Sequence, residues 1–285
     1  RYLFTFTLRD DASSRFSKST RWGLFPSAAF AWNIKEESFL KNVRPVSQLK
    51  LRLSAGQTGQ QEIGSNYPYL ARYSMSTDVY HQYNMGSDGY MFYLTPQAYD
   101  PNIKWETTTT YNVGLDFGFL NDRISGSFDA YIRDTKDLLN SVITPMGSNF
   151  GNTVLTNIGS MRNKGLEFSF NFIPVQTKDW NLSIGVNGTF QDTKFTKLNN
   201  TDDPDYAIQT GGITKGTGNL LQRHMVGYEP YTFYTFQQMY DSEGHPIQNA
   251  LVDRDGDGSI TQADRYMTGK SPNPDFFYGI NLKLS

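Results

Sequence analysis

The sequence predicts an all-β protein: an antiparallel transmembrane β-barrel portion with about eight long strands, short periplasmic turns and long extracellular loops. Three observations lead to this prediction: strict alternation of apolar with polar or small residues, the length of the alternating segments, and the unequal lengths of the connections. Alternation with a period of two is typical of a strand with one apolar face. A tilted membrane-spanning strand needs roughly 9–11 residues, whereas strands are most often about 5–6 residues long.

The clearest pair of strands lies between Tyr111 and Arg133. In its first half every second residue is apolar, namely Tyr111, Val113, Leu115, Phe117 and Phe119. The tripeptide 121–123 follows, and alternation then resumes from Ile124. Two alternating segments joined by a tight turn containing Asn and Asp predict an antiparallel hairpin.

The strands expected before this hairpin cover residues 1–8, 22–34 and 49–56. Residues 1–8 have an aromatic or leucine side chain at every even position, and residues 22–34 alternate through Pro26, Ala28, Phe30, Trp32 and Ile34. In the segment 49–56, leucines alternate with Lys50 and Arg52. Both cations should face the barrel interior, because a charge facing lipid is destabilising.

The hairpin itself supplies strands at 104–120 and 123–135. Residues 165–172 then alternate Leu or Phe with Gly, Glu, Ser and Asn, and residues 182–191 repeat the pattern. The last strand starts near Phe276.

Long and short connections occur in turn along the chain. The long connections are 9–21, 57–103, 136–162 and 197–274, and the short ones are 35–48, 121–123 and 174–179. Outer-membrane barrels have this asymmetry, with their long loops outside the cell. A soluble all-β domain with large loops at one end is the alternative. Strand length, lumen-sided charge and the 20 Phe and 18 Tyr together favour the barrel.

Composition excludes several other classes. A formal charge of -2 gives no argument for nucleic-acid binding, and the absence of Cys removes disulfides, thiol catalysis and thiolate metal sites. Alternation begins at the first residues and is interrupted at the last ones. We therefore expect residues 1–285 to be an internal part of a longer barrel domain.

Seven pieces of sequence, taken in order, resemble the SusC/RagA-type TonB-dependent outer-membrane transporters. They are SSRF (13–16), RWGLFPSAAFAW (21–32), LKLRLSAGQTGQQEIG (49–64), IKWETT (103–108), GLDFGFLNDRISGSFDAYIRDTKDLL (114–139), NIGSMRNKGLEF (157–168) and DRDGDGSIT (253–261). The resemblance covers nearly the whole chain, and it depends on the ordered set rather than on any single piece.

This resemblance implies a barrel of about 22 strands with a plugged lumen, in the outer membrane of a Gram-negative bacterium. It implies energy-coupled import of an oligosaccharide, or of a peptide, beneath a SusD-type surface lipoprotein. The TonB complex would act through a missing N-terminal part. The plug, the TonB box and the C-terminal strands of the barrel would all lie outside this chain.

The segment VDRDGDGSITQAD, within the long loop 197–274, has the spacing of a Ca²⁺-binding loop. Candidate ligands stand at loop positions 1, 3, 5, 7 and 12: Asp253, Asp255, Asp257, Ser259 and Asp264. Alternate carboxylates suit a hard cation, and Gly258 permits the sharp turn. Asp at position 12 is shorter than the usual Glu. The alternative is an Asp- and Gly-rich surface turn that binds nothing tightly.

Two further groups of residues are candidates for contact with ligand or partner. The insert 57–103 is rich in tyrosine, with a candidate surface at Tyr67, Tyr69, Tyr73, Tyr80, Tyr83, Tyr90 and Tyr93. These rings suit sugar faces or a lid protein, although each one could instead pack its own loop. The expected lumen charges are Lys50, Arg52, Asp116, Asp129, Arg133 and Glu167. They would steer solutes or form a solvated ladder of ion pairs.

The four tryptophans, Trp22, Trp32, Trp105 and Trp180, lie near strand ends and are expected in the membrane-interface belt. Catalysis finds little support, because His81, His224 and His245 lack ligand spacing and no nucleophile or phosphate-binding motif occurs. Three rival functions stay open: a soluble calcium-stabilised carbohydrate-binding domain at the cell surface, a TonB-dependent receptor for metal chelates (siderophores) and, more distantly, a glycosidase.

Overall fold

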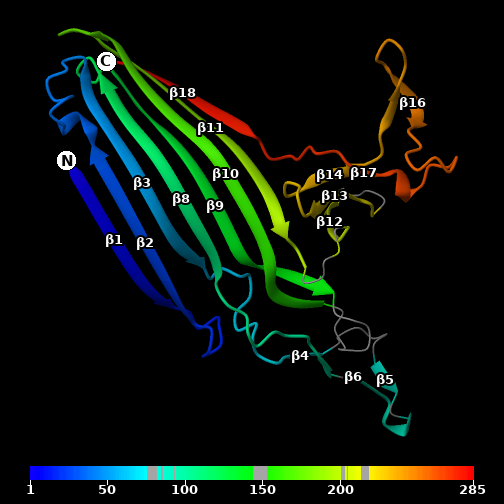
Figure 1. The fold of residues 1–285 in the computed structure, drawn as a ribbon. Helices are drawn as coiled ribbons and strands as arrows, with labels where there is room; N and C mark the ends of the chain where they lie inside the picture. The colour runs from blue at the N-terminus through cyan, green and yellow to red at the C-terminus, as the bar shows by residue number, and fades with distance from the viewer. Residues whose placement is uncertain are drawn as a thin grey trace.

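The computed structural model describes residues 1–75, 82–84, 86–92, 94–143, 153–199, 203, 205–212 and 218–285. Its main feature is one curved antiparallel sheet of eight strands in the order β1-β2-β3-β8-β9-β10-β11-β18 (Figure 1). The strands are β1 (Tyr2–Ala12), β2 (Trp22–Asn33), β3 (Val46–Gln60), β8 (Glu106–Phe119), β9 (Ile124–Ile143), β10 (Thr153–Gln176), β11 (Asn181–Lys197) and β18 (Phe276–Leu284). The sheet does not close on itself, because β1 and β18 each pair on one side alone.

The smaller elements lie in the connections. They are η1 (Ile34–Glu36), β4 (Tyr73–Met75), β5 (Gln82–Asn84), η2 (Gly86–Asp88), β6 (Tyr90–Phe92), β7 (Leu94–Pro96), β12 (Ala207–Gly212), β13 (Leu220–Met225), β14 (Thr232–Thr235), β15 (Gln238–Tyr240), β16 (Pro246–Leu251), η3 (Gln262–Asp264) and β17 (Tyr266–Met267). None of the helices in the described ranges could span a bilayer.

The strand register lines up apolar residues in rows across one face of the sheet. One row contains a residue from each of the eight strands: Phe4, Phe30, Leu53, Val113, Ala130, Leu166, Phe190 and Phe276. The side chains stay uncovered, with Phe4 73% and Leu166 57% exposed. No second layer packs on this face in the described part of the chain (Figure 1). We call it the outer face and the opposite, polar one the inner face.

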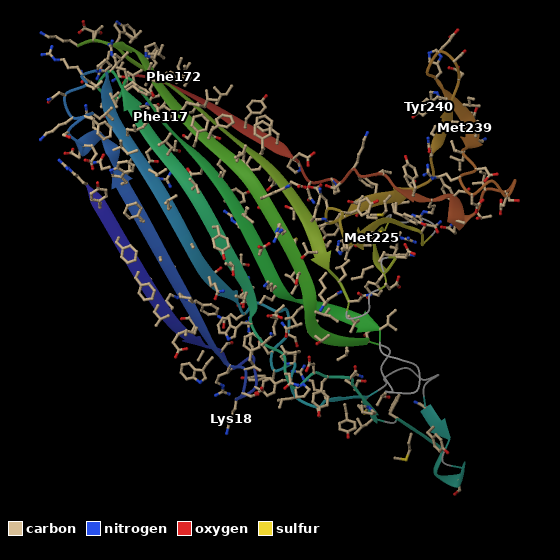
Figure 2. The ribbon with its side chains drawn as sticks, in the orientation of Figure 1. Lys18, Phe117, Phe172, Met225, Met239 and Tyr240 are labelled. Carbon is tan, nitrogen blue, oxygen red and sulfur yellow. The ribbon has the colours of Figure 1, made fainter. Side chains whose placement is uncertain are left out.

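Long and short connections leave from opposite ends of the sheet, as the sequence predicts. The inserts that contain β4–β7 and β12–β17 lie at one end, and η1 and the tight turn after β8 lie at the other (Figure 1). Phe117 and Phe172 lie towards the short-turn end, and Lys18 lies at the opposite end (Figure 2). The two ends match the periplasmic and extracellular ends expected of a barrel.

Several predicted boundaries are wrong, because strands run into expected inserts: β1 extends to Ala12, β3 to Gln60 and β9 to Ile143. Residues 136–162 are expected to form an insert, but β9 continues to Ile143 and β10 begins at Thr153. Apolar alternation stops there because outward positions become charged, as at Asp134 and Arg162, while the backbone ladder continues. The long loop 197–274 likewise contains a four-stranded sheet, β12-β13-β14-β17, and the hairpin β15-β16.

The main buried apolar cluster of the described residues lies at the extracellular end of the inner face. It consists of Phe16, Phe25, Ile103 and Trp105. The Trp105 ring packs 5.3 Å from Phe16 and 5.5 Å from Phe25, between ring centroids, and its Nε1 donates to the carbonyl of Arg21 at 3.0 Å. Placing Trp105 in the interface belt is therefore wrong, because it is 8% exposed in this core, whereas Trp22 and Trp180 are more than half exposed.

Candidate functional site

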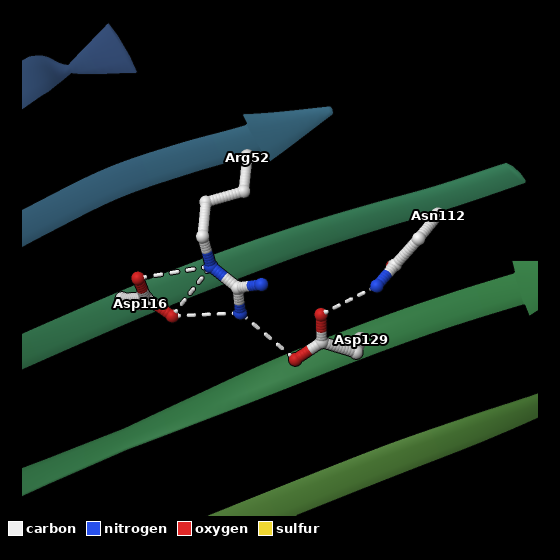
Figure 3. A network of polar contacts seen from close by, with 4 residues as sticks. All are labelled: Arg52, Asn112, Asp116 and Asp129. Carbon is white, nitrogen blue, oxygen red and sulfur yellow. Dashed lines mark hydrogen bonds and ion pairs between the residues drawn. The ribbon is translucent and has the colours of Figure 1, made fainter. Parts of the chain in front are cut away.

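The inner face carries a network of charges that spans three strands (Figure 3). Arg52 on β3 donates from Nε to both carboxylate oxygens of Asp116 on β8, each at 3.0 Å. Its Nη2 lies 2.9 Å from Oδ2 of Asp129 on β9. Asn112 completes the network by donating from Nδ2 to Oδ1 of Asp129 at 3.2 Å. One guanidinium thus binds two carboxylates, the arrangement for which its fork of donors is suited.

A glycine makes this network possible. Gly114 lies directly between Arg52 and Asp129 in the register. A Cβ at Gly114 would lie 2.4 Å from Oδ1 of Asp129 and 2.7 Å from Cζ of Arg52. Alternation along the sequence predicts Arg52, Asp116 and Asp129 as lumen charges, but it does not single out Asn112 and Gly114. The polar alternation of β8 is the signal that could have found them.

The other expected lumen charges share this face but not this network. Lys50 lies opposite Asp116, and Glu167 lies opposite Asp129. The guanidinium of Arg133 stacks over the Tyr131 ring, 4.3 Å from its centroid. None of Lys50, Arg133 and Glu167 has an ion-pair partner among the described residues. The inner face is thus polar, with charges of both signs.

The insert 57–103 exposes aromatic and apolar side chains. Tyr67, Tyr73 and Tyr83 are 46%, 66% and 64% exposed, and Tyr67 meets Tyr69 edge to face with ring centroids 6.4 Å apart. Tyr80 and Tyr93 lie outside the described residues, and Tyr90 is described by its backbone in β6 alone. Other exposed side chains of this insert are Leu70, Met75, Met91, Phe92, Leu94 and Tyr99. The insert therefore offers a surface for another molecule.

The acidic loop brings three of its predicted ligands together. Carboxylate oxygens of Asp253, Asp255 and Asp257 lie within 4.8 Å of one another. Asp253 accepts hydrogen bonds from the backbone N–H groups of Gly256 and Gly258, at 2.7 and 2.8 Å. Oxygen ligands this close to one another suit Ca²⁺. Ser259 donates its backbone N–H to Asp257 at 2.7 Å.

Asp264, the predicted ligand at position 12, is not one of the three carboxylates that converge. Its side chain is fully buried, and it accepts hydrogen bonds from the backbone N–H groups of Arg254 and Thr261, both at 2.7 Å. These bonds from Thr261 and Arg254 lower the pKa of Asp264. The N–H of Asp257 favours the charged form of Asp255, but burial and the neighbouring carboxylates hold the pKa of Asp255 above its ordinary value. A cation beside Asp255 would relieve this repulsion.

Neither of the two described histidines belongs to a candidate metal site. His224 packs between Phe195 and Tyr231, and burial lowers its pKa. His245 lies in the β15-β16 turn, with its Nδ1 3.6 Å from Oδ2 of Asp241. His81 lies outside the described residues.

Comparisons with known proteins agree with this architecture. The family model described as TonB dependent receptor-like, beta-barrel matches residues 1–277. The chain is 50% identical over 285 residues to the TonB-dependent receptor SusC of Bacteroides thetaiotaomicron, covering 100% of this chain and 28% of SusC. It is 34% identical over 297 residues to the TonB-dependent receptor P3 of Formosa agariphila, covering 100% of this chain and 29% of that receptor.

Solved structures are similar over the same length. The RagAB peptide transporter matches with a TM-score of 0.78 and 27% identity, over 100% of this chain and 30% of that one. The RagAB peptide importer in its "open-open" state matches with a TM-score of 0.79 and 26% identity, over 100% of this chain and 29% of that one. The chain thus spans less than a third of the length of these relatives.

Proposed function

This chain belongs to the TonB-dependent receptor-like β-barrel family, in its SusC/RagA type, and from that premise we propose that it forms part of an outer-membrane importer for large nutrients. The family places it in the outer membrane of a Gram-negative bacterium. In this proposal the nutrient is an oligosaccharide, or alternatively a peptide. Import would take its energy from the TonB complex, and a SusD-type lipoprotein would cover the outer opening.

The observation that carries the proposal is the contrast between the two faces of the sheet. The outer face has an uncovered apolar row across all eight strands, suited to lipid. The inner face carries Arg52, Asp116 and Asp129, which suit a hydrated passage for polar solutes. A soluble carbohydrate-binding domain would cover such an apolar face. Neither this alternative nor a metal-chelate receptor is favoured.

In this proposal the chain binds the nutrient and lets it pass through the barrel, and it breaks no bond in the nutrient. Its aromatic insert 57–103 would touch the nutrient or the lid lipoprotein, since tyrosine rings and hydroxyls match the C–H faces and hydroxyl groups of sugars. Whether the nutrient is a sugar or a peptide decides which contacts dominate. The RagAB complex is a peptide importer, so both classes belong in the test.

The test is uptake by cells that lack the chromosomal gene and carry the full-length protein on a plasmid. Fluorescent oligosaccharides and oligopeptides of matched mass are offered separately, and uptake is measured with and without the TonB complex. We expect one of the two classes to enter in a TonB-dependent manner. Failure of both classes to enter, with the protein present in the outer membrane, would contradict the proposal.

We also propose that the acidic loop holds a weak, structural Ca²⁺ ion. Asp253, Asp255 and Asp257 would bind it through their converging oxygens, and Ser259 could add its backbone carbonyl. Asp264 would hold the loop closed from the side. The ion would stiffen the insert 197–274 and offset part of its ordering entropy. Millimolar Ca²⁺ should slow proteolysis of this insert in the full-length protein, and Asp255→Ala should abolish that effect; equal rates with Ca²⁺ and with chelator would contradict it.

A further inference from the structure

The outer face changes from apolar to charged towards its extracellular end. The row that begins at Phe6 continues through Ala28, Ala55, Tyr111 and Ile132 and ends in the charged residues Lys164 and Asp192. On β8 to β11 the next row towards the extracellular side is polar: Thr109, Asp134, Arg162 and Lys194. On β1 and β2 this row keeps the apolar residues Leu8 and Pro26. Because charge on the lipid side is tolerated near the interface and not at the midplane, this change marks the outer boundary of the hydrocarbon.

The ion pairs at this boundary leave positive charge over. Arg162 is matched by Asp134, with hydrogen bonds of 2.6 and 3.0 Å. The Nζ atoms of Lys164 and Lys194, by contrast, share the single carboxylate of Asp192, at 3.3 and 3.4 Å. Two ammonium groups on one carboxylate carry a net charge of +1. Both lysines are more than half exposed, so this charge is available to an anion from outside.

A pocket of about 370 Å³ lies at these cations. On the sheet side it is lined by Arg162, Lys164 and Lys194, and on the side of the insert 197–274 it is lined by Val226 and Gly227. Backbone hydrogen bonds hold this edge of the insert against β11, since Gly227 donates to the carbonyl of Phe195 at 2.9 Å and Phe195 donates to that of Tyr228 at 3.1 Å. The pocket therefore has one basic wall and one wall of fixed backbone.

An apolar groove of about 580 Å³ adjoins this pocket on the outer face. Its apolar lining includes Tyr111, Val113, Ala130, Ile132, Leu166 and Phe190. Ala130 contributes a small side chain to the groove, between Val113 and Leu166 in the register. Lys164 and Asp192 line both the groove and the pocket, so the two adjoin; Asp275 also lines the groove.

We propose that the groove and the adjoining pocket together bind a phosphate-bearing lipid of the outer leaflet. An acyl chain would lie in the groove over Ala130, and a headgroup phosphate would contact Lys164, Lys194 and Arg162. An apolar groove that ends, at the hydrocarbon boundary, in two exposed ammonium groups sharing one carboxylate matches an amphiphilic anion, whereas free phosphate would leave the groove empty. Each cation near a charged membrane surface contributes about fivefold in affinity. The site is independent of nutrient passage, because it lies on the outer face of the barrel wall.

The experiment uses the full-length protein in detergent, with native mass spectrometry as the readout. The probes are diphosphorylated lipid A, its fully dephosphorylated form, and inorganic phosphate. We expect retention of the phosphorylated lipid by the unaltered protein, weaker retention of the dephosphorylated lipid, and no adduct with millimolar phosphate. The variant R162Q/K164Q/K194Q should lose retention of the phosphorylated lipid by at least about tenfold. Ala130→Phe, which fills the groove from the lipid side, should weaken the retention of both lipids.

The matched control removes three cations from connecting segments, as K18Q/R44Q/K178Q. Lys18 lies at the same end of the sheet but in a loop (Figure 2), and Arg44 and Lys178 lie in connections at the other end. This control should retain the lipid as the unaltered protein does. Equal loss in both triple variants, equal retention of the two lipids, or saturation of the site by free phosphate would overturn the proposal; in that case the charges are a solvated ladder of ion pairs.

Discussion

Arg52 and Asp129 form an ion pair although their strands are not neighbours. Nη2 of Arg52 lies 2.9 Å from Oδ2 of Asp129, and β8 runs between them. The side chains meet over Gly114, where a Cβ would strike both partners. A position without a side chain on β8 is thus what allows β3 and β9 to be joined across the inner face.

Replacing Gly114 with Ala should therefore break this bridge. The added methyl cannot fit unless Arg52 or Asp129 moves, and the loss of a charged hydrogen bond costs roughly 1–3 kcal/mol. We expect a lower unfolding midpoint in urea for the full-length protein in detergent. Gly279→Ala is the matched control. A Cβ at Gly279 would lie 3.0 Å from its nearest neighbour, Oδ1 of Asn187, which is at the end of a flexible side chain. Equal midpoints for G114A and the unaltered protein would refute the role of Gly114.

A second prediction concerns the assignment of the two faces. Leu166→Lys places a charge in the apolar row of the outer face, where the cost at the bilayer midplane is about 2–4 kcal/mol. Ser169→Lys places the same charge on the same strand, β10, but on the inner face beside Ser127 and Asn187. We expect strong destabilisation in lipid bilayers for L166K and little for S169K. The reverse order would mean that the faces are assigned the wrong way round.

Trp105 should stabilise the extracellular end of the barrel wall. Trp105→Ala removes the centre of the core formed with Phe16, Phe25 and Ile103, and such truncations cost about 3–5 kcal/mol. Trp180→Ala, at an exposed position in the turn after β10, is the control and should cost much less. The rate of proteolysis of the segments 13–21 and 57–103 measures the difference in stability between the two variants. Similar cleavage in both variants would show that this core is dispensable.

The acidic loop should open at low pH through Asp264. Hydrogen bonds from Thr261 and Arg254 lower the pKa of this carboxyl, so the folded loop favours its charged form. The resulting stabilisation is complete above the unfolded pKa of about 3.9 and is lost as pH falls through the lower folded pKa. We expect pepsin to cleave near residues 253–264 only below about pH 4.

Asp264→Asn should remove this pH dependence. The amide carries no charge, and an NH2 donor replaces one of the two acceptor oxygens of the carboxylate. Its loop should be cleaved equally at pH 5 and pH 3. Asp257→Asn, in the exposed part of the same loop, should keep the pH dependence of the unaltered protein. Protection of D264N at pH 5 would contradict this role for Asp264.

The alternating residues predicted most of the barrel wall. All eight long strands begin or end near the expected positions wherever the outer face is apolar, because a single buried or lipid-facing surface imposes a period of two. The prediction was wrong at 136–162, where the outward residues are charged and the hydrogen-bonded strands continue regardless. It also assigned no strand within the insert 197–274, because the short strands β12 to β17 have too few residues to show a period.

The sequence by itself determined which residues share a face, since alternation along a strand is a local property. It therefore named Arg52, Asp116 and Asp129 as inner-face charges and placed Asp253, Asp255 and Asp257 at ligand spacing. Only the tertiary structure decided which of these residues meet, because register and strand order set the distances between strands. For this reason only the structure revealed the role of Gly114, the core at Trp105 and the cations beside Asp192. Each of these depends on neighbours far away in the chain.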